Sequence, residues 1–458
     1  MEKIFKSVLW TNLKKHKLYL DDESVASLNK IDEKRVSDFA VKTEDMIFDF
    51  SNNIIDQKAM DGISKIFSAL NVDKKIEGYF EESGEFSYHF FYRSLREDKY
   101  KHNSKFVYGE VEKLFFAIEK IEEKVENKEI DGKYFSDFVV VLNADNKAFI
   151  KAQYESLKPF KRVGRNLHFV SCVQDLESVL RRIFLNNTFF IFADKELKDE
   201  LFLQTFSRFK DIKGFNKQTA FVCQNAKFAL KLDENAENIV SYSSLVEDAF
   251  NFFALQLLPF EIIFGKDVLR QYLNGLRDID LQVRNDFENS IPYKMAGIYE
   301  LYKLFDECQI NNLVIYTKTP LAPFVATLYE QLMSLKGKKY PAFGYQTFCP
   351  RNKRFLRDIT NKDKKTLNEI IYFNNTDDNF LSDISFLSKK EAFFNVLAFK
   401  EYSPQNIGRL FGIYEYFVII LKLLIDGNLK SQSMEYEFEV NAKNKSIANI
   451  ANFLGQAE

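Results

Sequence analysis

Two blocks of alternating apolar strands and amphipathic helices dominate the sequence. In the first block, short apolar runs rich in β-branched and aromatic residues predict strands, and the segments between them have helical periodicity. The predicted strands are 138–142, 167–170, 188–193 and 219–224, and the predicted helices are 147–157, 174–184 and 195–209. Apolar strands that alternate with helices indicate a doubly wound parallel sheet.

A second block of the same kind follows a long helical stretch at about 245–307. Its predicted strands are 312–317, 369–373 and 393–399, and its predicted helix is 321–335. Ser403 and Pro404 supply an N-cap and a first-turn proline for a helix that reaches about Ile425. We therefore predict an α/β protein with two doubly wound parallel-sheet domains between helical ends. The predicted parts are 1–45 (helical), 46–245 (first domain), 246–400 (second domain) and 401–458 (C-terminal helical arm).

Composition and charge exclude several classes of function. Lys plus Arg (64) nearly cancels Asp plus Glu (66), so the net charge of -2 gives no general attraction to nucleic acid or to an acidic membrane. The most apolar stretch, Phe411 to Ile425, is interrupted by Glu415 and Lys422 and is too short to span a bilayer. The N-terminus also lacks the apolar segment of a secretion signal. We expect a cytoplasmic, soluble protein with no nucleic-acid or membrane partner.

Cysteine and glycine usage argue against two kinds of site. The four cysteines are widely spaced and form no CxxC pair, which predicts reduced, mostly buried thiols, no metal site and no cofactor. They are Cys172, Cys223, Cys308 and Cys349. Sixteen glycines is about half the usual share of roughly 7%. Because loops that hold phosphate on backbone N–H groups need glycines, several such loops are not expected.

The turn after the first predicted strand shows the same shortage. The run from Asp137 to Asn146 is a buried-strand pattern that reaches its turn as Asn-Ala-Asp-Asn, where phosphate-binding proteins usually place glycines. Open α/β sheets bind ligands in the crevice at the carboxyl ends of their strands. The sequence therefore predicts the scaffold of such a site without its usual phosphate-binding residues.

Several stretches, taken in order, resemble one known family over nearly the whole chain. They are 168–173 with 187–195, 246–265, 324–338 and 403–415. The first pair resembles the strands that lead to the phosphate loop of glucose-6-phosphate isomerase, and 246–265 resembles its Gly-Gly-Arg helix. The last two resemble its catalytic helix and its Ser-Pro helix that ends in Leu-Tyr-Glu. The resemblance implies two sugar-isomerase (SIS) domains and a dimeric assembly.

The resemblance also implies catalytic positions, and this sequence fills them with other residues. The family's proton-shuttling glutamate corresponds to Ser334, and the histidine that helps to open the sugar ring corresponds to Lys353. Its C-terminal lysine corresponds to Glu439, and the arginine of Gly-Gly-Arg to Ala249. An unactivated serine hydroxyl cannot act as the base, and positioned acid–base catalysis is commonly worth about 10²–10⁴-fold. We therefore predict no catalytic residue.

The positions implied for sugar-phosphate binding are altered as well. The family's Gly-Gly-Ser turn is replaced by Ala144-Asp145-Asn146, and its Ser/Thr-rich phosphate loop by the acidic run Asp194 to Glu200. A unit negative charge about 4 Å from a carboxylate is opposed by roughly 1 kcal/mol in water and about 4 kcal/mol at an effective dielectric constant near 20. The alternative, which involves no ligand, is that this run is the capped, solvated first turn of a helix. The degenerate positions are Ala144, Asp145, Asn146, Asp194, Lys195, Glu196, Lys198, Asp199, Glu247 and Asp248.

Three further interpretations concern charged residues and histidines. Acidic and basic residues on opposite sides of the implied crevice are expected to pair and fill it. They are Glu247, Asp248 and Glu439 on one side and Lys336, Lys353 and Arg354 on the other. The basic stretch 351–365 lacks the interleaved aromatics of a nucleic-acid site and is interpreted as a solvated face. His89 and His168 are interpreted as core or interface histidines.

Together these observations predict a catalytically degenerate member of the glucose-6-phosphate isomerase family, a pseudoenzyme. It would act through structure, regulation or partner binding, as a homodimer or with another protein, and sugar-phosphate binding is disfavoured. Two alternatives stay open. One is an active aldose–ketose isomerase that interconverts glucose 6-phosphate and fructose 6-phosphate with relocated groups. The other is a binding module for a non-phosphorylated or cationic ligand.

Overall fold

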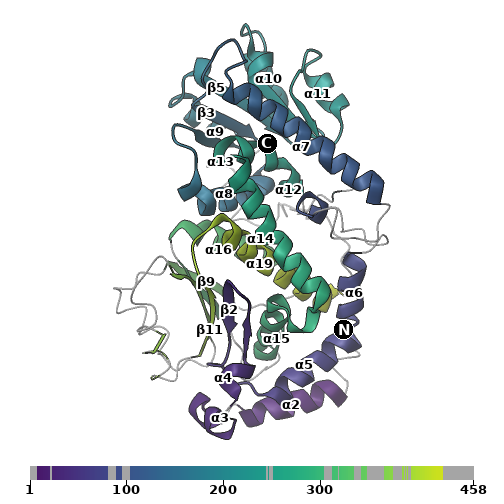
Figure 1. Ribbon diagram of the computed structural model, residues 1–458, viewed down its shortest axis with the longest axis vertical. Helices are drawn as coiled ribbons and strands as arrows, with labels where there is room; N and C mark the ends of the chain where they lie inside the picture. The colour runs from purple at the N-terminus through teal and green to yellow at the C-terminus, as the bar shows by residue number, and fades with distance from the viewer. Residues whose placement is uncertain are drawn as a thin grey trace, which may run out of the picture.

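Two β-sheets lie towards the two ends of the molecule, and long helices lie between them (Figure 1). The structure is a computed structural model that describes residues 8–20, 23–32, 34–80, 89–94, 104–243, 246, 251–303, 312–317, 319–334, 342–347, 366–374, 384–385, 387, 389 and 393–426. The sheet at the top of Figure 1 contains β3 and β5, and the sheet lower down contains β2, β9 and β11. The predicted α/β fold with two sheets is confirmed.

The upper sheet is parallel throughout. In spatial order its strands are β4 (Asn166–Val170), β3 (Asp137–Val141), β5 (Thr188–Ala193), β6 (Thr219–Cys223) and β7 (Ile239–Ser241). Every residue of β5 is buried, because its alternating side chains enter two separate hydrophobic clusters, one on each face of the sheet. The four predicted strands of this block are confirmed within one residue at each end. The three-residue β7 was not predicted.

The helices that connect these strands differ from prediction at their ends. They are α8 (Ala144–Leu157), α9 (Val173–Leu180), α10 (Glu200–Phe209) and α11 (Ala226–Leu232). The predicted helix 195–209 begins only at Glu200, because Asp199 is its N-cap and accepts a 2.9 Å hydrogen bond from the N–H of Leu201. Leu197 also has a left-handed backbone (φ 53°), which a helix does not contain.

The lower sheet is mixed rather than wholly parallel. Its order is β1 (Ala40–Lys42), β2 (Met46–Asp49), β11 (Phe394–Phe399), β10 (Thr366–Phe373), β8 (Asn312–Thr317) and β9 (Ala342–Thr347). The last four are parallel, as predicted, but β1 and β2 form an antiparallel hairpin that adds to β11. A strand near the N-terminus therefore completes the sheet formed by the second βα block. The hairpin and β9 were not predicted.

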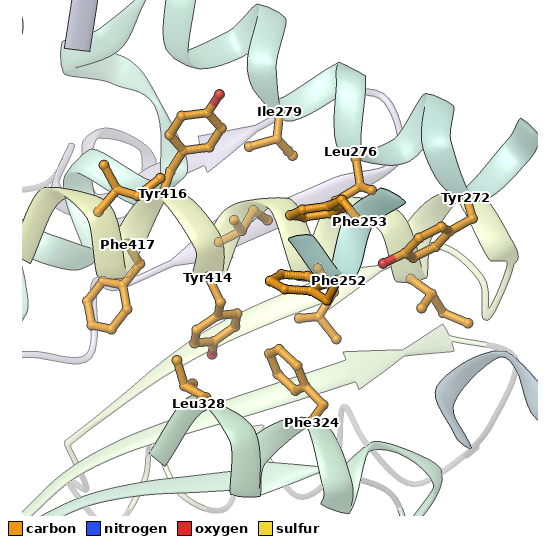
Figure 2. Packing of buried hydrophobic residues seen from close by; sticks show 14 of the residues in the cluster. Phe252, Phe253, Tyr272, Leu276, Ile279, Phe324, Leu328, Tyr414, Tyr416 and Phe417 are labelled. Carbon is orange, nitrogen blue, oxygen red and sulfur yellow. The ribbon is translucent and has the colours of Figure 1, made fainter. Parts of the chain in front are cut away.

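Helices occupy the N-terminal region and the middle of the molecule. The first group is α2 (Val8–Leu20), α3 (Val25–Ile31), α4 (Arg35–Asp38), α5 (Gln57–Ala69) and α6 (Val72–Tyr79). The remaining helices are α7 (Ser104–Glu126), which contacts β7 of the upper sheet, and α12 (Asn251–Leu255), α13 (Leu257–Phe264), α14 (Lys266–Asn285), α15 (Ile291–Lys303), α16 (Ala322–Ser334) and α19 (Pro404–Asp426). Figure 2 shows side chains of α12, α14, α16 and α19 converging in one hydrophobic cluster. The predicted helices at 321–335 and from Pro404 are confirmed in α16 and α19.

The crossing of α14 and α19 is unusually close. A Cβ atom on Gly275 would lie 1.9 Å from the carbonyl oxygen of Gln405, and one on Gly408 would lie 2.1 Å from the carbonyl oxygen of Tyr272. Real Cβ contacts are never this short, so the backbones touch where both helices lack a side chain. Next to this crossing, the rings of Phe324 on α16 and Tyr414 on α19 pack edge to face with centroids 5.1 Å apart.

A buried ionic cluster joins the short helix η1 (His89–Tyr92), α14 and α19. Arg93 donates to both carboxylate oxygens of Asp280, at 2.8 and 2.6 Å, and to Glu415 at 2.8 Å. His89 Nε2 lies 2.8 Å from Glu415, and Tyr416 donates to Asp280 at 2.7 Å. Burial raises the pKa of Asp280 to about 6 despite Arg93. Burial opposes ionisation of Glu415 too, but Arg93 and His89 outweigh it and lower its pKa to about 2. His89 is thus a core histidine, as interpreted.

The cysteines only partly follow expectation. Cys223 is buried, but Cys172 is exposed, and both are free thiols. The prediction of burial is wrong for Cys172 because its sulfur caps α9, accepting a 3.4 Å hydrogen bond from the N–H of Asp175 at the surface. Cys308 and Cys349 lie outside the described residues. Within the described residues, none of the helices could cross a membrane.

Candidate functional site

The strand order of the upper sheet marks one place where a ligand is expected. The chain passes from β3 to β4 on one side and then crosses over to β5 on the other, so the order reverses between β3 and β5. Val141 pairs with Phe192, which brings the carboxyl ends of these two strands together. Open α/β sheets bind ligands at such a point. The turns at 142–146 and 194–199 therefore form the candidate site.

The turn after β3 is a capped helix start rather than a glycine loop. Asn143 is the N-cap of α8, and its side-chain oxygen accepts a 2.9 Å hydrogen bond from the N–H of Asn146. Ala144 and Asp145 are exposed in the first helical turn, and Asn146 is buried. The structure thus places these three predicted positions at the site. A side chain already satisfies one of the N–H groups at this helix N-terminus.

The loop after β5 is organised by the side chain of Asp194. Its Oδ2 accepts hydrogen bonds from the N–H groups of Glu196 and Leu197, both at 3.3 Å, and the N–H of Lys195 contributes a further one. Burial raises the pKa of Asp194, although these N–H groups oppose the rise. The left-handed Leu197 curls the loop so that successive N–H groups point to one spot, the geometry of an anion-binding nest. A carboxylate of the protein itself occupies this nest.

The two turns touch. The side-chain amide of Asn143 donates to Oδ1 of Asp194 at 3.3 Å. Asn143 was not among the residues predicted for the site. No local pattern could have indicated its contact, because the partners are 51 positions apart in the sequence.

The charged side chains beside the nest are largely paired. Glu196 and Lys198 form a 2.5 Å ion pair, which raises the pKa of the exposed lysine. On α8, Lys147 donates to Asp175 at 2.5 Å and to Ser171 at 3.1 Å. Although burial opposes ionisation, these partners lower the pKa of Asp175 to about 2. This lysine is therefore committed to an ion pair, and sequence reasoning had missed it.

The interpretation of the acidic run as a capped helical turn is correct for only part of it. Asp199 caps α10 and is exposed, as that interpretation requires. Asp194 instead lies before the helix and organises the loop. Its half-buried carboxylate would repel an incoming anion, whereas neutral or cationic groups would meet no such repulsion.

Several predicted positions cannot be placed in the site. Ser334 is the last residue of α16. The expected pairing across the crevice falls on residues outside the described ones, so it stays a prediction. Those outside are Ala249, Lys353, Glu439, Glu247, Asp248, Lys336 and Arg354, together with the basic stretch 351–365. His168, in the middle of β4, lies 2.9 Å from Asp137, the first residue of β3, so its ring reaches towards the amino ends of the strands and away from the site. No cluster of metal-binding side chains occurs in the described ranges.

The fold assigns the chain to a class. It matches the crystal structure of a glucose-6-phosphate isomerase from Chlamydia trachomatis D/UW-3/Cx with a TM-score of 0.76, over 99% of this chain and 97% of that one, at 14% identity. The protein is thus a double-sheet α/β protein with the architecture of a sugar isomerase. The sequence profile described as Phosphoglucose isomerase matches residues 49–347. The chain belongs to the phosphoglucose isomerase family.

Named relatives agree with this assignment at low identity. The chain is 22% identical to a glucose-6-phosphate isomerase of Marinomonas sp. (strain MWYL1), over 68% of its own length and 61% of that protein. It is also 22% identical to a glucose-6-phosphate isomerase of Coxiella burnetii (strain Dugway 5J108-111), over 63% of its length and 56% of that protein. The matches thus span less than two thirds of these relatives.

Proposed function

We propose that this chain is a phosphoglucose isomerase homologue that does not turn over sugar phosphates and acts instead by structure or partner binding. The observation that supports this most is the carboxylate of Asp194. It takes up the N–H groups of the loop after β5, which in a phosphate-binding loop point at the ligand. A phosphate would have to displace a covalently attached anion from these donors.

The electrostatic cost adds to this competition. A unit charge about 4 Å from an ionised carboxylate is opposed by roughly 1 kcal/mol in water and about 4 kcal/mol at an effective dielectric constant near 20. Asp194 is half-buried, so its environment lies between these limits. Nearby Lys147 is held by Asp175 and does not supply a free compensating charge.

Family correspondence supports the same proposal for the reaction itself. By the resemblance, the family's glutamate base corresponds to Ser334, and its histidine, lysine and arginine correspond to Lys353, Glu439 and Ala249. A chain with none of these groups lacks the acid, the base and the cation that isomerisation of a sugar phosphate uses. We place the protein in the cytoplasm as a homodimer or with a protein partner.

A coupled assay tests the proposal directly. Fructose 6-phosphate is supplied, and glucose 6-phosphate is detected by its oxidation with a dehydrogenase. We expect a rate equal to that of a reaction without the protein. A rate that rises with protein concentration and saturates with substrate would overturn the proposal in favour of an active isomerase with relocated groups.

Ligand binding provides the second test, and Asp194→Ser is its informative variant. Serine removes the competing charge and frees the loop N–H groups, so inorganic phosphate and fructose 6-phosphate should stabilise this variant against heat but not the wild-type protein. The matched control is Asp145→Ser, which removes an exposed carboxylate of the same site but leaves the nest occupied. Equal stabilisation of the wild-type protein by phosphate would contradict self-occupation of the nest.

A binding module for a non-phosphorylated ligand is the second candidate. The carboxylate of Asp194 next to the amide of Asn143 favours it, because this pair could bind hydroxyl or ammonium groups. Thermal-shift measurements with neutral sugars and polyamines test it. Stabilisation by one of them that Asp194→Asn abolishes would support this role, and no stabilisation by either class would remove it.

A further inference from the structure

Helix α13 carries one carboxyl group in an otherwise apolar sequence. All eight of its residues are buried, and Glu261 is only 3% exposed. Within the described part of the chain, no hydrogen bond or ion pair reaches its side chain. Buried acids are normally paired, so an unpaired one calls for an explanation.

Charged groups from two neighbouring helices surround Glu261. Glu119 and Glu122 of α7 raise its pKa, and Lys266 and Arg270 of α14 lower it. The cations face Glu119 as well: Lys266 forms an ion pair with it, and Arg270 lies 3.8 Å from it. Two carboxylates and two already engaged cations therefore make up the electrostatic surroundings of Glu261.

Further ion pairs hold the same face of α7. Arg162, from the loop before β4, donates to Glu122 at 2.5 Å and lies 3.6 Å from Glu126. Arg165 of the same loop pairs with Glu126 and donates to the backbone carbonyl of Ile262 in α13. The acids of α7 thus dock the helix through arginines that also bind α13.

The protonation state of Glu261 decides whether an unpaired charge is buried between α7 and α13. Burial, and then Glu119 and Glu122, raise its pKa from 4.5 to about 7. When neutral, Glu261 adds no charge to the contact between α7 and α13. When ionised, Glu261 is a buried charge without a direct partner, and both its desolvation and its repulsion by Glu119 and Glu122 disfavour the contact between α13 and α7.

We propose that Glu261 is a proton-controlled lock that docks α7 on α13 when neutral and loosens this contact when ionised. The lock is independent of the β3–β5 site and of whether the chain is catalytic. It acts on the helix that leads to β3 and that also contacts η1 and β7. A rise from slightly acidic to slightly alkaline pH would therefore release α7 without a ligand.

Hydrogen–deuterium exchange of α7 tests the lock in the full-length protein. Exchange is measured at about pH 6 and about pH 8 and corrected for the intrinsic pH dependence of amide exchange. With a docked pKa of about 7 and an undocked value near 4.5, linkage gives a roughly tenfold loss of α7 protection at the higher pH. Protection that is equal at both values would overturn the proposal.

Variants separate the lock from a general effect of pH. Glu261→Gln keeps the size of the side chain but cannot ionise, so its α7 protection should not change between the two pH values. Glu123→Gln, an exposed change on α7, should keep the wild-type profile. Should Glu261→Gln fail to fold, Glu122→Gln removes one repelling neighbour, which lowers the pKa of Glu261 and should move the midpoint of the loss to lower pH. A tenfold loss that persists in Glu261→Gln, or an unmoved midpoint in Glu122→Gln, would contradict the lock.

Discussion

Asn143 donates a hydrogen bond from its side-chain amide to the carboxylate of Asp194, and this contact ties together the turns that follow β3 and β5. Each partner also satisfies backbone N–H groups of its own turn. The carboxyl edge of the upper sheet is therefore held by its own side chains. This has consequences for stability that can be measured.

Replacing Asp194 by alanine should destabilise the protein by about 1–3 kcal/mol, because partly buried N–H groups lose their acceptor. Asp194→Asn should cost less, since the amide oxygen can still accept. Urea unfolding at neutral pH measures both free energies. Equal costs for alanine and asparagine would show that the lost hydrogen bonds are not the cause.

The close crossing of α14 and α19 predicts a large effect of a single methyl group. Gly275→Ala places a Cβ atom 1.9 Å from a backbone oxygen, so the helices must move apart. Overpacking usually costs about 1–3 kcal/mol, and a clash with backbone should reach the upper end or exceed it. Gly109→Ala in α7 is the control, because nothing lies within 4 Å of its new methyl group. Helix propensity predicts that this control gains up to about 1 kcal/mol.

Removing one partner of a buried ion pair should destabilise the protein more than replacing both partners. Arg93→Met leaves Asp280 without its cation and Glu415 with His89 alone, and it should cost about 3–5 kcal/mol. Adding Asp280→Asn should restore part of this loss, because one uncompensated charge disappears. A double-mutant cycle in urea measures the coupling. Additive effects of the two changes would contradict a direct interaction.

Glu369 on β10 should make stability depend on pH. Its carboxyl accepts a hydrogen bond from Tyr414, yet burial dominates and raises its pKa from 4.5 to about 7. Between these values the native protein holds a proton that the unfolded chain has released. The free energy of unfolding should therefore fall by roughly 3 kcal/mol as pH rises from about 4.5 to about 7, and stay level above that.

Glu369→Gln isolates this contribution from that of Asp280, whose pKa is also raised. The unfolding free energy of the wild type minus that of the variant should fall by roughly 3 kcal/mol between about pH 4.5 and about pH 7 and stay level above that. Denaturant unfolding at several pH values provides the measurement. A difference that does not vary with pH would show that Glu369 does not titrate in this range.

The sequence predicted those elements whose signals are local. The run 188–193 is apolar at every position after Thr188, which suits a strand covered on both faces, and β5 has these bounds. The N-cap and proline at 403 and 404 likewise set the start of α19. The hairpin of β1 and β2 escaped prediction because its strands are short and because β2 pairs with β11, which lies far along the chain.

The candidate site was predictable as a set of residues but not as an arrangement. The pattern of the acidic run 194–200 predicts helix for most of it, since nothing in its composition shows that the side chain of Asp194 turns back on its own loop. The contact with Asn143 depends on the strand order, and the pairing of Lys147 with Asp175 depends on the approach of α8 to the first turn of α9. Such contacts follow from tertiary structure alone.

The position of β2 in the lower sheet also affects synthesis. β2 ends at Asp49 and its partner β11 begins at Phe394, so about 345 residues must be translated between them. At about 5–20 residues per second, the ribosome needs on the order of 20–70 s to deliver the partner strand. During this interval the free edge of β2 has only β1 beside it. The last third of the chain must therefore be under synthesis before β2 can pair with β11.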